Sequence, residues 1–288
     1  MKLATFDEGN GPEVGIVVSE AIIPLTRAKP QLAATMIDLI SHWPTARAEV
    51  EQVVAKNEGP LPLASIRLLA PIPRPGKIWA IGLNYADHIA ESGMETPKNQ
   101  VWFSKARSAV NGPYDPIELP SVPTPHVDYE AELVTVIGAG GRHIPAANAP
   151  DAIFGYCVGN DVTERAWQHS GPQWSLGKSF DSHAPFGPWI VTADEIPDPH
   201  SLGIRCLING ETRQESNTQH LVFNLWDQIA HLSSAMTLAA GDVIYTGTPG
   251  GVGAAMKPMQ FLQDGDVVRV EIDGIGMIEA RCRTDGRA

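Results

Sequence analysis

Acidic side chains are concentrated between residues 126 and 137, a stretch that reads HVDYEAELVTVI. Its tail is rich in β-branched residues, which favour an extended strand. Residues two apart in a strand project from the same face, so Glu130 and Glu132 are predicted to be neighbours. Two adjacent carboxylates repel each other, and on an otherwise apolar strand this repulsion is destabilising unless water or a cation screens it.

A third carboxylate, Asp161, follows the apolar run IFGYCVG at residues 153–159 and is predicted to stand at the end of a strand, where clefts open. Three carboxylates suit Mg²⁺ or Mn²⁺, with the remaining positions left to water and substrate. They suit zinc poorly, because neither His nor Cys belongs to the cluster. From the residues alone an alternative stays open, in which Asp161 caps a helix and the two glutamates form a solvated pair on an edge strand.

Lys178 lies between a glycine and a serine, in a segment without helical periodicity. A lysine in a pocket near a metal could bind a carboxylate or stabilise a developing oxyanion. The alternative from composition alone is a solvated lysine on the surface.

His88 and Glu91 lie in a predicted helix that has Asn84 as a plausible N-cap and Gly93 as a plausible stop. Residues three apart share a helix face, so Glu91 could hold the imidazole of His88 and raise its basicity towards water. An incidental pair on a surface helix is the alternative.

Arg165 and Gln168 follow Asp161 in a predicted helix over residues 162–168, so they are expected near one side of it. Arg165 either contacts a substrate carboxylate or pairs with an acidic neighbour. The glycine-rich loop at residues 246–253 lacks both the GxGxxG spacing and a Walker lysine, which argues against a nucleotide site.

Five stretches occur in the order seen in the fumarylacetoacetate hydrolase family, which the chain resembles over about residues 78–285. They are NYADH at 84–88, DYEAE at 128–132, GYCVGNDVTER at 155–165, GKSFD at 177–181 and TGTPGGVG at 246–253. The resemblance is to the branch of acylpyruvate hydrolases and 2-hydroxyhepta-2,4-diene-1,7-dioate isomerases, and it implies a homodimer.

Roles for single residues follow from this resemblance. The family's metal ligands fall on Glu130, Glu132 and Asp161, and its active-site lysine falls on Lys178. In hydrolytic and decarboxylating members, a His and Glu at the spacing of His88 and Glu91 sit on a flexible lid that orders over substrate. The loop at 246–253 lines the pocket in this family, and the Thr248 hydroxyl is the expected substrate contact, beside Arg165 and Gln168.

The expected function is Mg²⁺-dependent hydrolysis of an acylpyruvate-type 2,4-dioxo acid, such as fumarylpyruvate or a diketo sugar acid, to pyruvate and a carboxylic acid. His88 would activate water and Lys178 would stabilise the oxyanion. A decarboxylase or isomerase of oxaloacetate-like or 2-hydroxy-dienedioate acids in aromatic catabolism is the alternative, because both reactions pass through the same enolate. A non-catalytic, metal-dependent binding protein is the alternative from another class.

Charge and composition exclude other classes of function. The net charge is −12 and no local run of Lys or Arg is present, so a nucleic-acid partner is not expected. No apolar stretch approaches the ~18–20 residues of a membrane span. The N-terminus has acidic residues and glycines where a signal peptide would be apolar, and the three cysteines are widely spaced. A cytoplasmic protein with reduced, mostly buried thiols is predicted.

The candidate site residues must be positioned mainly by strands. The strands are rich in Val and Ile, and they occur with few helices and no regular βαβ order. We predict an α+β fold: a small N-terminal α/β domain over residues 1–70 and a β-rich, mixed-sheet roll over residues 71–288. The first domain is expected to hold strands near 3–6 and 15–18 and helices near 31–40 and 45–56. Five prolines between residues 60 and 75 predict a stiff, extended connector.

Overall fold

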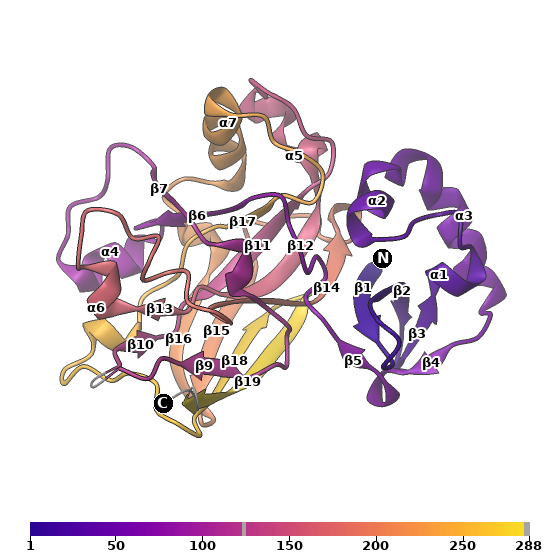
Figure 1. Cartoon of the computed structure of the whole chain (residues 1–288). Coiled ribbons are helices and arrows are strands. Elements are labelled where there is room, and N and C mark those ends of the chain that lie inside the picture. Colours follow the sequence, from indigo (N-terminus) through magenta and orange to yellow (C-terminus); the bar gives the residue numbers. More distant parts are fainter. Residues whose placement is uncertain (123–124, 285–288) are drawn as a thin grey trace.

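A computed structural model describes residues 1–122 and 125–284. The N-terminal elements lie on one side of the molecule (Figure 1). They are β1 (Lys2–Asp7), β2 (Glu13–Val18), β3 (Ala21–Pro24), α1 (Leu25–Ala28), α2 (Met36–Ser41), α3 (Trp43–Lys56), β4 (Leu61–Pro62) and β5 (Arg67–Leu68). Both strands predicted here and the longer helix are thus confirmed.

Two details of this unit differ from the prediction. The helix expected over residues 31–40 begins only at Met36, because Thr35 and Asp38 form a capping box in which each side chain bonds the other's backbone N–H. The predicted connector is also wrong as a plain linker, since β4 pairs with β3 and β5 pairs with β1. Much of the proline-rich segment therefore belongs to the N-terminal sheet.

The rest of the chain is dominated by strands, as predicted. Its first elements are β6 (Ile78–Gly82), α4 (Ala86–Ser92), β7 (Val101–Ser104), β8 (Val110–Asn111), β9 (Ile117–Leu119), β10 (Val127–Asp128), β11 (Ala131–Ile137), α5 (Ala149–Ala152) and β12 (Ile153–Asn160). They are followed by β13 (Thr163–Glu164), α6 (Arg165–Gln168), β14 (Ala184–Thr192), β15 (Gly203–Ile208), β16 (Glu211–Asn217), α7 (Leu225–Ala235), β17 (Val243–Tyr245), β18 (Val267–Ile272) and β19 (Gly276–Thr284).

One mixed sheet of twelve strands extends through both parts of the chain. Its main order is β4-β3-β2-β1-β14-β12-β11-β17-β6-β7, and a second sheet has the order β16-β15-β18-β19-β9. The N-terminal strands join the large sheet where β1 pairs antiparallel with β14. The predicted boundary at residue 71 stays a prediction, because the two units share a sheet.

The large sheet is buried on both faces. Leu133 and Val158 point into a core that also contains Val270 and Ile278 of the second sheet. Their strand neighbours Val134 and Cys157 face the opposite way, into a core shared with the N-terminal helices. Two sheets that pack in this way, with a minority of helices, form the predicted α+β roll, and they hold β11 and β12 rigidly at its centre.

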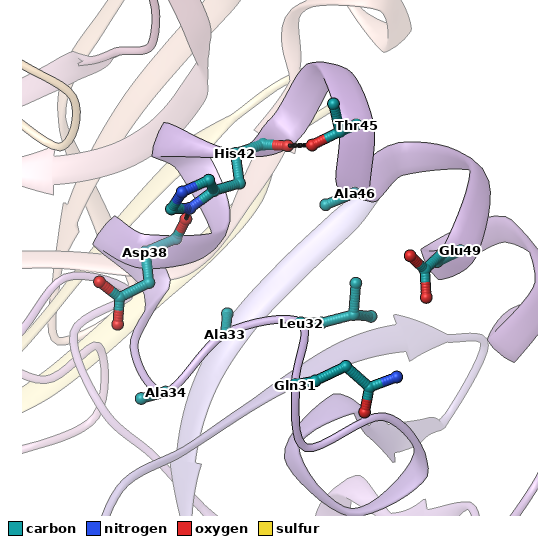
Figure 2. A pocket seen from close by; sticks show the side chains of 9 residues that line it. All are labelled: Gln31, Leu32, Ala33, Ala34, Asp38, His42, Thr45, Ala46 and Glu49. Carbon is teal, nitrogen blue, oxygen red and sulfur yellow. Dashed lines mark hydrogen bonds between the residues drawn. The ribbon is translucent and has the colours of Figure 1, made fainter.

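The N-terminal unit has a cavity of its own, of about 400 Å³, between α2 and α3 (Figure 2). Its polar side chains are already used locally. The Asp38 carboxylate accepts from the Thr35 backbone N–H at 3.0 Å, and Glu49 pairs with Lys29 at 3.1 Å. His42 Nδ1 lies 2.9 Å from the Asp38 carbonyl oxygen. These contacts cap helices and pair surface charges, so the candidate site is sought elsewhere.

Two further predictions concern the whole chain. Cys157, Cys206 and Cys282 are buried free thiols, as expected. Across residues 1–122 and 125–284, no helix has both the length and the apolar character needed to cross a bilayer.

Candidate active site

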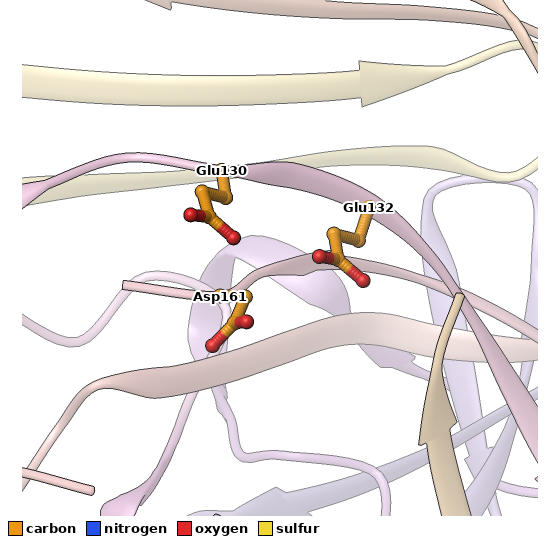
Figure 3. A group of neighbouring side chains, drawn as sticks. All are labelled: Glu130, Glu132 and Asp161. Atoms are coloured by element: carbon orange, nitrogen blue, oxygen red, sulfur yellow. The ribbon is translucent and has the colours of Figure 1, made fainter. Parts of the chain in front are cut away.

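Three acidic side chains converge where β11 and β12 meet the loops around them (Figure 3). Glu130 immediately precedes β11, Glu132 is the second residue of β11, and Asp161 immediately follows β12. One carboxylate oxygen of each lies within 4.8 Å of the others, and all three residues are buried. The structure therefore brings together the three residues that were predicted to form one cluster.

Backbone pairing produces this convergence. Glu132 lies opposite Gly159 in the antiparallel register of β11 and β12, and the Asp161 N–H donates to the Glu130 carbonyl oxygen at 2.8 Å. A Cβ at Gly159 would lie 2.4 Å from the Val134 side chain and 2.8 Å from Tyr245, so the close approach of these strands requires glycine. The carboxylates are thus fixed by the most rigid part of the sheet.

Cationic side chains surround the cluster. Lys178 Nζ donates to both Glu130 Oε2 and Asp161 Oδ2 at 2.7 Å, which places it where the family resemblance implied. Lys105, at the end of β7, bonds the other oxygen of Asp161 and is fully buried. The role of Lys105 was missed, and its position at the end of the strand-like run VWFSK at 101–105 was the signal in the sequence.

Arg165 pairs with acidic neighbours, as one of its two alternatives predicted. Its guanidinium lies 2.7 Å from Glu130 and donates from Nε to Asp128 at 2.9 Å. It also donates to the Gln168 amide oxygen at 3.0 Å. Asp128 in turn accepts from the backbone N–H groups of Gly253 and Ala254 at 2.8 and 2.9 Å. Arg165 and Gln168 therefore support the cluster, and a substrate contact for them stays a prediction.

The helix predicted over residues 162–168 is largely wrong. Thr163 and Glu164 form β13, which pairs with β10, and only Arg165–Gln168 is helical. Glu164 is the N-cap, and its carboxylate accepts from Trp167 N at 2.7 Å. Asp161 therefore does not cap this helix, and its carboxylate instead accepts from Lys105 and Lys178.

The two glutamates of the cluster have opposite electrostatic environments. Burial alone would raise the pKa of Glu130, but the charges of Lys178 and Arg165 lower it to about 2. Burial and the charges of Asp161 and Glu130 raise the pKa of Glu132 well above its ordinary value. Within the described ranges Glu132 forms no direct ion pair, and its carboxylate accepts only from Gly247 N, at 2.7 Å; the charge of Lys178 offsets its raised pKa only in part.

This environment fits a divalent cation. Hard cations such as Mg²⁺ and Mn²⁺ prefer carboxylate oxygens, which are the donors that Glu130, Glu132 and Asp161 present. A cation bound by Glu132 would supply the positive charge that its buried carboxylate otherwise lacks. We therefore assign these three residues as the candidate metal ligands.

The predicted pair of His88 and Glu91 lies on α4, where His88 Nδ1 is 2.8 Å from Glu91 Oε1. Because Glu91 holds Nδ1, Nε2 is the ring nitrogen left for chemistry. The pair is linked to the cluster through the loop at 246–253, because Gly251 N donates to Glu91 and Gly247 N donates to Glu132, each at 2.7 Å. Gly93 ends the helix in the left-handed conformation, as predicted.

Asn84 is not the N-cap that was predicted, because Tyr85 occupies that position. The Asn84 side chain is buried and bonds the Thr246 and Phe223 carbonyl oxygens at 2.8 and 3.0 Å. It also accepts from Phe223 N at 2.8 Å. Asn84 thus ties the start of α4 to the loop at 246–253.

Thr248 lies in this loop, and its hydroxyl accepts from Gln214 Nε2 at 2.8 Å. The Gln214 side-chain oxygen accepts from Ala131 N at 2.9 Å, between the two glutamates. Gln214 was missed because the sequence of β16, ETRQESN, lacks the apolar alternation that predicts a strand. A substrate contact for Thr248 stays a prediction.

Residues 77–283 match the family model described as fumarylacetoacetate (FAA) hydrolase C-terminal. The chain belongs to the fumarylacetoacetate hydrolase family. The match covers the candidate metal ligands, both site lysines and the His88–Glu91 pair, and it leaves the N-terminal unit outside.

Relatives within the family differ in their reactions. The chain is 42% identical over 270 residues to oxaloacetate tautomerase Fahd2a, mitochondrial, of Rattus norvegicus, covering 93% of this chain and 86% of the rat protein. It is 34% identical to a maleylpyruvate hydrolase from Sphingobium sp. SYK-6, solved with manganese(II) and pyruvate, with a TM-score of 0.84 over 99% of each chain. A 2-hydroxyhepta-2,4-diene-1,7-dioate isomerase from Mycobacterium marinum is 31% identical, with a TM-score of 0.77 over 100% of each chain.

The buried His183 should make the stability of the protein depend on pH. His183 is fully buried, its Nε2 lies 2.9 Å from the Glu118 carbonyl oxygen, and its Nδ1 has no hydrogen-bond partner among the residues that the structure describes. Burial lowers its pKa to about 3, whereas an unfolded chain titrates near 6.5. The unfolded state therefore binds the proton more readily, and stability is lost as the pH falls below about 6.5.

We expect this residue alone to cost about 2 kcal/mol of unfolding free energy between pH 7.5 and pH 5. In His183→Gln, the difference between the two pH values should shrink by about that amount, as measured by urea denaturation. Replacement of the exposed His231 by Gln is the matched control. An unchanged pH difference in His183→Gln would show that His183 is not held neutral by its burial.

Proposed function

We propose that the chain is a divalent-metal-dependent enzyme that converts a small 2-oxo acid through its enolate, and that keto–enol tautomerisation of oxaloacetate is its reaction. The observation that carries this proposal is the buried Glu132 carboxylate, which forms no ion pair within the described residues and stands in a cluster with Glu130 and Asp161; the loop at 246–253 links this cluster to the helix that carries His88. The identity to the rat oxaloacetate tautomerase over most of the chain supports the choice of substrate.

The charge balance of the buried site suits an anionic substrate. Its carboxylates exceed its cationic side chains by one; the groups are Asp128, Glu130, Glu132 and Asp161 against Lys105, Lys178 and Arg165. A divalent cation would turn this excess into one net positive charge. The carboxylate next to the 2-oxo group would then neutralise the site, and the second carboxylate of oxaloacetate would lie outside this balance.

When bound, Mg²⁺ or Mn²⁺ would polarise the 2-oxo group and stabilise the negative charge of the enolate. The ligands would be Glu130, Glu132 and Asp161. His88 Nε2 would take a proton from carbon 3, and Glu91 would stabilise the imidazolium that forms. Return of a proton to the oxygen on carbon 2 completes the enol, so that no atom is gained or lost.

Hydrolysis of the carbon–carbon bond of an acylpyruvate is the second candidate, and the His88–Glu91 pair favours it. A neutral imidazole oriented by a carboxylate can activate water as well as remove a proton from carbon. Water would add to the distal carbonyl group, and cleavage would release pyruvate and a carboxylic acid. The resemblance to the maleylpyruvate hydrolase, which was solved with manganese(II) and pyruvate, supports this reading.

A substrate panel tests both candidates. Oxaloacetate enolisation followed by ultraviolet absorbance, CO₂ release from oxaloacetate, and loss of fumarylpyruvate should each be measured with Mg²⁺, Mn²⁺ and excess chelator. We expect metal-dependent enolisation to be the fastest of the three reactions. Faster cleavage of fumarylpyruvate would favour the second candidate. Metal binding without turnover of any substrate would indicate a non-catalytic binding protein.

Two wider expectations are part of this proposal. The cytoplasmic location stays a prediction, and the rat relative is by its name a mitochondrial protein. The homodimer implied by the family also stays a prediction.

A further inference from the structure

Helix α4, which carries His88, is fastened to the body of the protein through Asp87. Asp87 Oδ2 accepts from the Ser216 hydroxyl on β16 at 2.6 Å. Asp87 Oδ1 accepts from Gly250 N at 3.2 Å and from the backbone N–H of His88 itself at 2.7 Å. One carboxylate thus links the helix, the loop after β17 and the edge strand of the second sheet.

The other end of α4 is held by the same loop. Glu91 Oε2 accepts from Gly251 N at 2.7 Å, while Oε1 holds His88. Gly251 has a φ of +102°, and a Cβ there would lie 2.0 Å from the Arg213 carbonyl oxygen on β16. The loop therefore fits between α4 and β16 only because this residue is glycine.

These contacts leave the metal-ligand candidates untouched. Asp87 bonds neither lysine of the site nor any of the three clustered carboxylates in the described ranges. It is the residue next to His88, however, and its partners determine how α4 sits on the protein. We propose that Asp87 is a positioning residue, which holds α4 on Ser216 and Gly250 and so fixes the position of His88; its effect on catalysis rests on the proposed function.

A positioning role and a role for the charge of Asp87 make different predictions. In Asp87→Asn, the amide oxygen can accept from Gly250 N and the amide nitrogen can donate to the Ser216 hydroxyl. The links to the loop and to β16 therefore survive the loss of charge. In Asp87→Ala both links are lost, and in Ser216→Ala only the link to β16 is lost.

The experiment compares these three variants with wild type and with Glu95→Ala, which removes an exposed carboxylate just beyond α4. Hydrogen–deuterium exchange of the backbone at residues 84–93 reports how firmly the helix is held. Calorimetric titration with Mn²⁺ measures whether the carboxylate cluster keeps its affinity for the metal. Steady-state kinetics with the substrate found in the panel separates kcat from KM.

We expect exchange at residues 84–93 to rise about fivefold to tenfold in Asp87→Ala and Ser216→Ala, with Mn²⁺ affinity unchanged. In Asp87→Ala, kcat should fall about tenfold to a hundredfold with little change in KM, because His88 is displaced. Asp87→Asn should stay within about threefold of wild type, as should Glu95→Ala.

Wild-type exchange in Asp87→Ala would overturn the proposal, as would an equal loss of kcat in Asp87→Asn and Asp87→Ala. The first result would show that the contacts do not hold the helix, and the second that charge is what matters. Exchange and Mn²⁺ binding need no substrate. If the panel finds no turnover, the proposed function therefore fails, while the exchange data still decide whether Asp87 holds α4.

Discussion

Glu132→Gln should stabilise the metal-free protein, whereas Glu130→Gln, two residues away, should destabilise it by about 3 kcal/mol. The pKa of Glu132 is raised well above its ordinary value by burial and by the two other carboxylates. At neutral pH the unfolded state carries Glu132 as a solvated carboxylate, whereas the folded state must either bury that charge or bind a proton, and both cost free energy. A neutral amide removes this cost, and stability should rise.

The argument for Glu130 has the opposite sign. Its pKa of about 2 lies below the ordinary value of 4.5, because Lys178 and Arg165 stabilise the charged form. That contribution is fully present above pH 4.5 and is lost as the pH falls towards 2. An amide at this position removes the negative charge, so the buried positive charges of Lys178 and Arg165 have one carboxylate fewer to offset them.

Denaturant unfolding at pH 7.5 in excess chelator measures both changes. Both variants should also lose calorimetric Mn²⁺ binding, and metal-dependent turnover should fall about a thousandfold or more, since several kcal/mol of charge stabilisation disappear. Equal destabilisation by the two substitutions would contradict the view that the buried negative charge of Glu132 is not fully offset by a cation. Retained Mn²⁺ affinity in both would contradict the assignment of the ligands.

Part of the carboxylate cluster could be predicted because its geometry is local, whereas the choice of Glu130, Glu132 and Asp161 as metal ligands came from the family resemblance. Alternation along one strand puts Glu130 and Glu132 on the same face, and the next long strand delivers Asp161 to the same end of the sheet. The roles of His88 and Lys178 came from family resemblance, since their spacing alone fits a surface position equally well. The structure bonds Lys178 to the cluster and links the helix of His88 to it through the loop at 246–253.

The supporting residues could not be predicted, because their contacts join distant parts of the chain. Lys105 reaches Asp161 across 56 residues, and Gln214 reaches Ala131 across 83. No periodicity within a segment encodes such a pair. The helix errors have a related cause: β10 pairs with residues that were expected to start a helix, and Asn84 is drawn into tertiary hydrogen bonds instead of capping α4.

Removal of the imidazole in His88→Ala should lower kcat by about a hundredfold to ten-thousandfold, while the protein keeps its affinity for Mn²⁺. The ligand candidates are fixed by β11 and β12, which do not depend on α4. Among the described residues the His88 ring bonds only Glu91, so its loss leaves the three carboxylates and their lysines in place. His88→Ala should therefore lower kcat without lowering the affinity for the metal.

Calorimetry with Mn²⁺ and single-turnover kinetics on the same preparation measure the two quantities. Glu91→Gln is the informative companion, because it keeps a partner for His88 Nδ1 but removes the negative charge that stabilises an imidazolium. If His88 acts as the base, Glu91→Gln should lie between wild type and His88→Ala. Full activity of His88→Ala with metal bound would remove the imidazole from the mechanism, and proton transfer would have to come from another group near the cluster, such as Lys178.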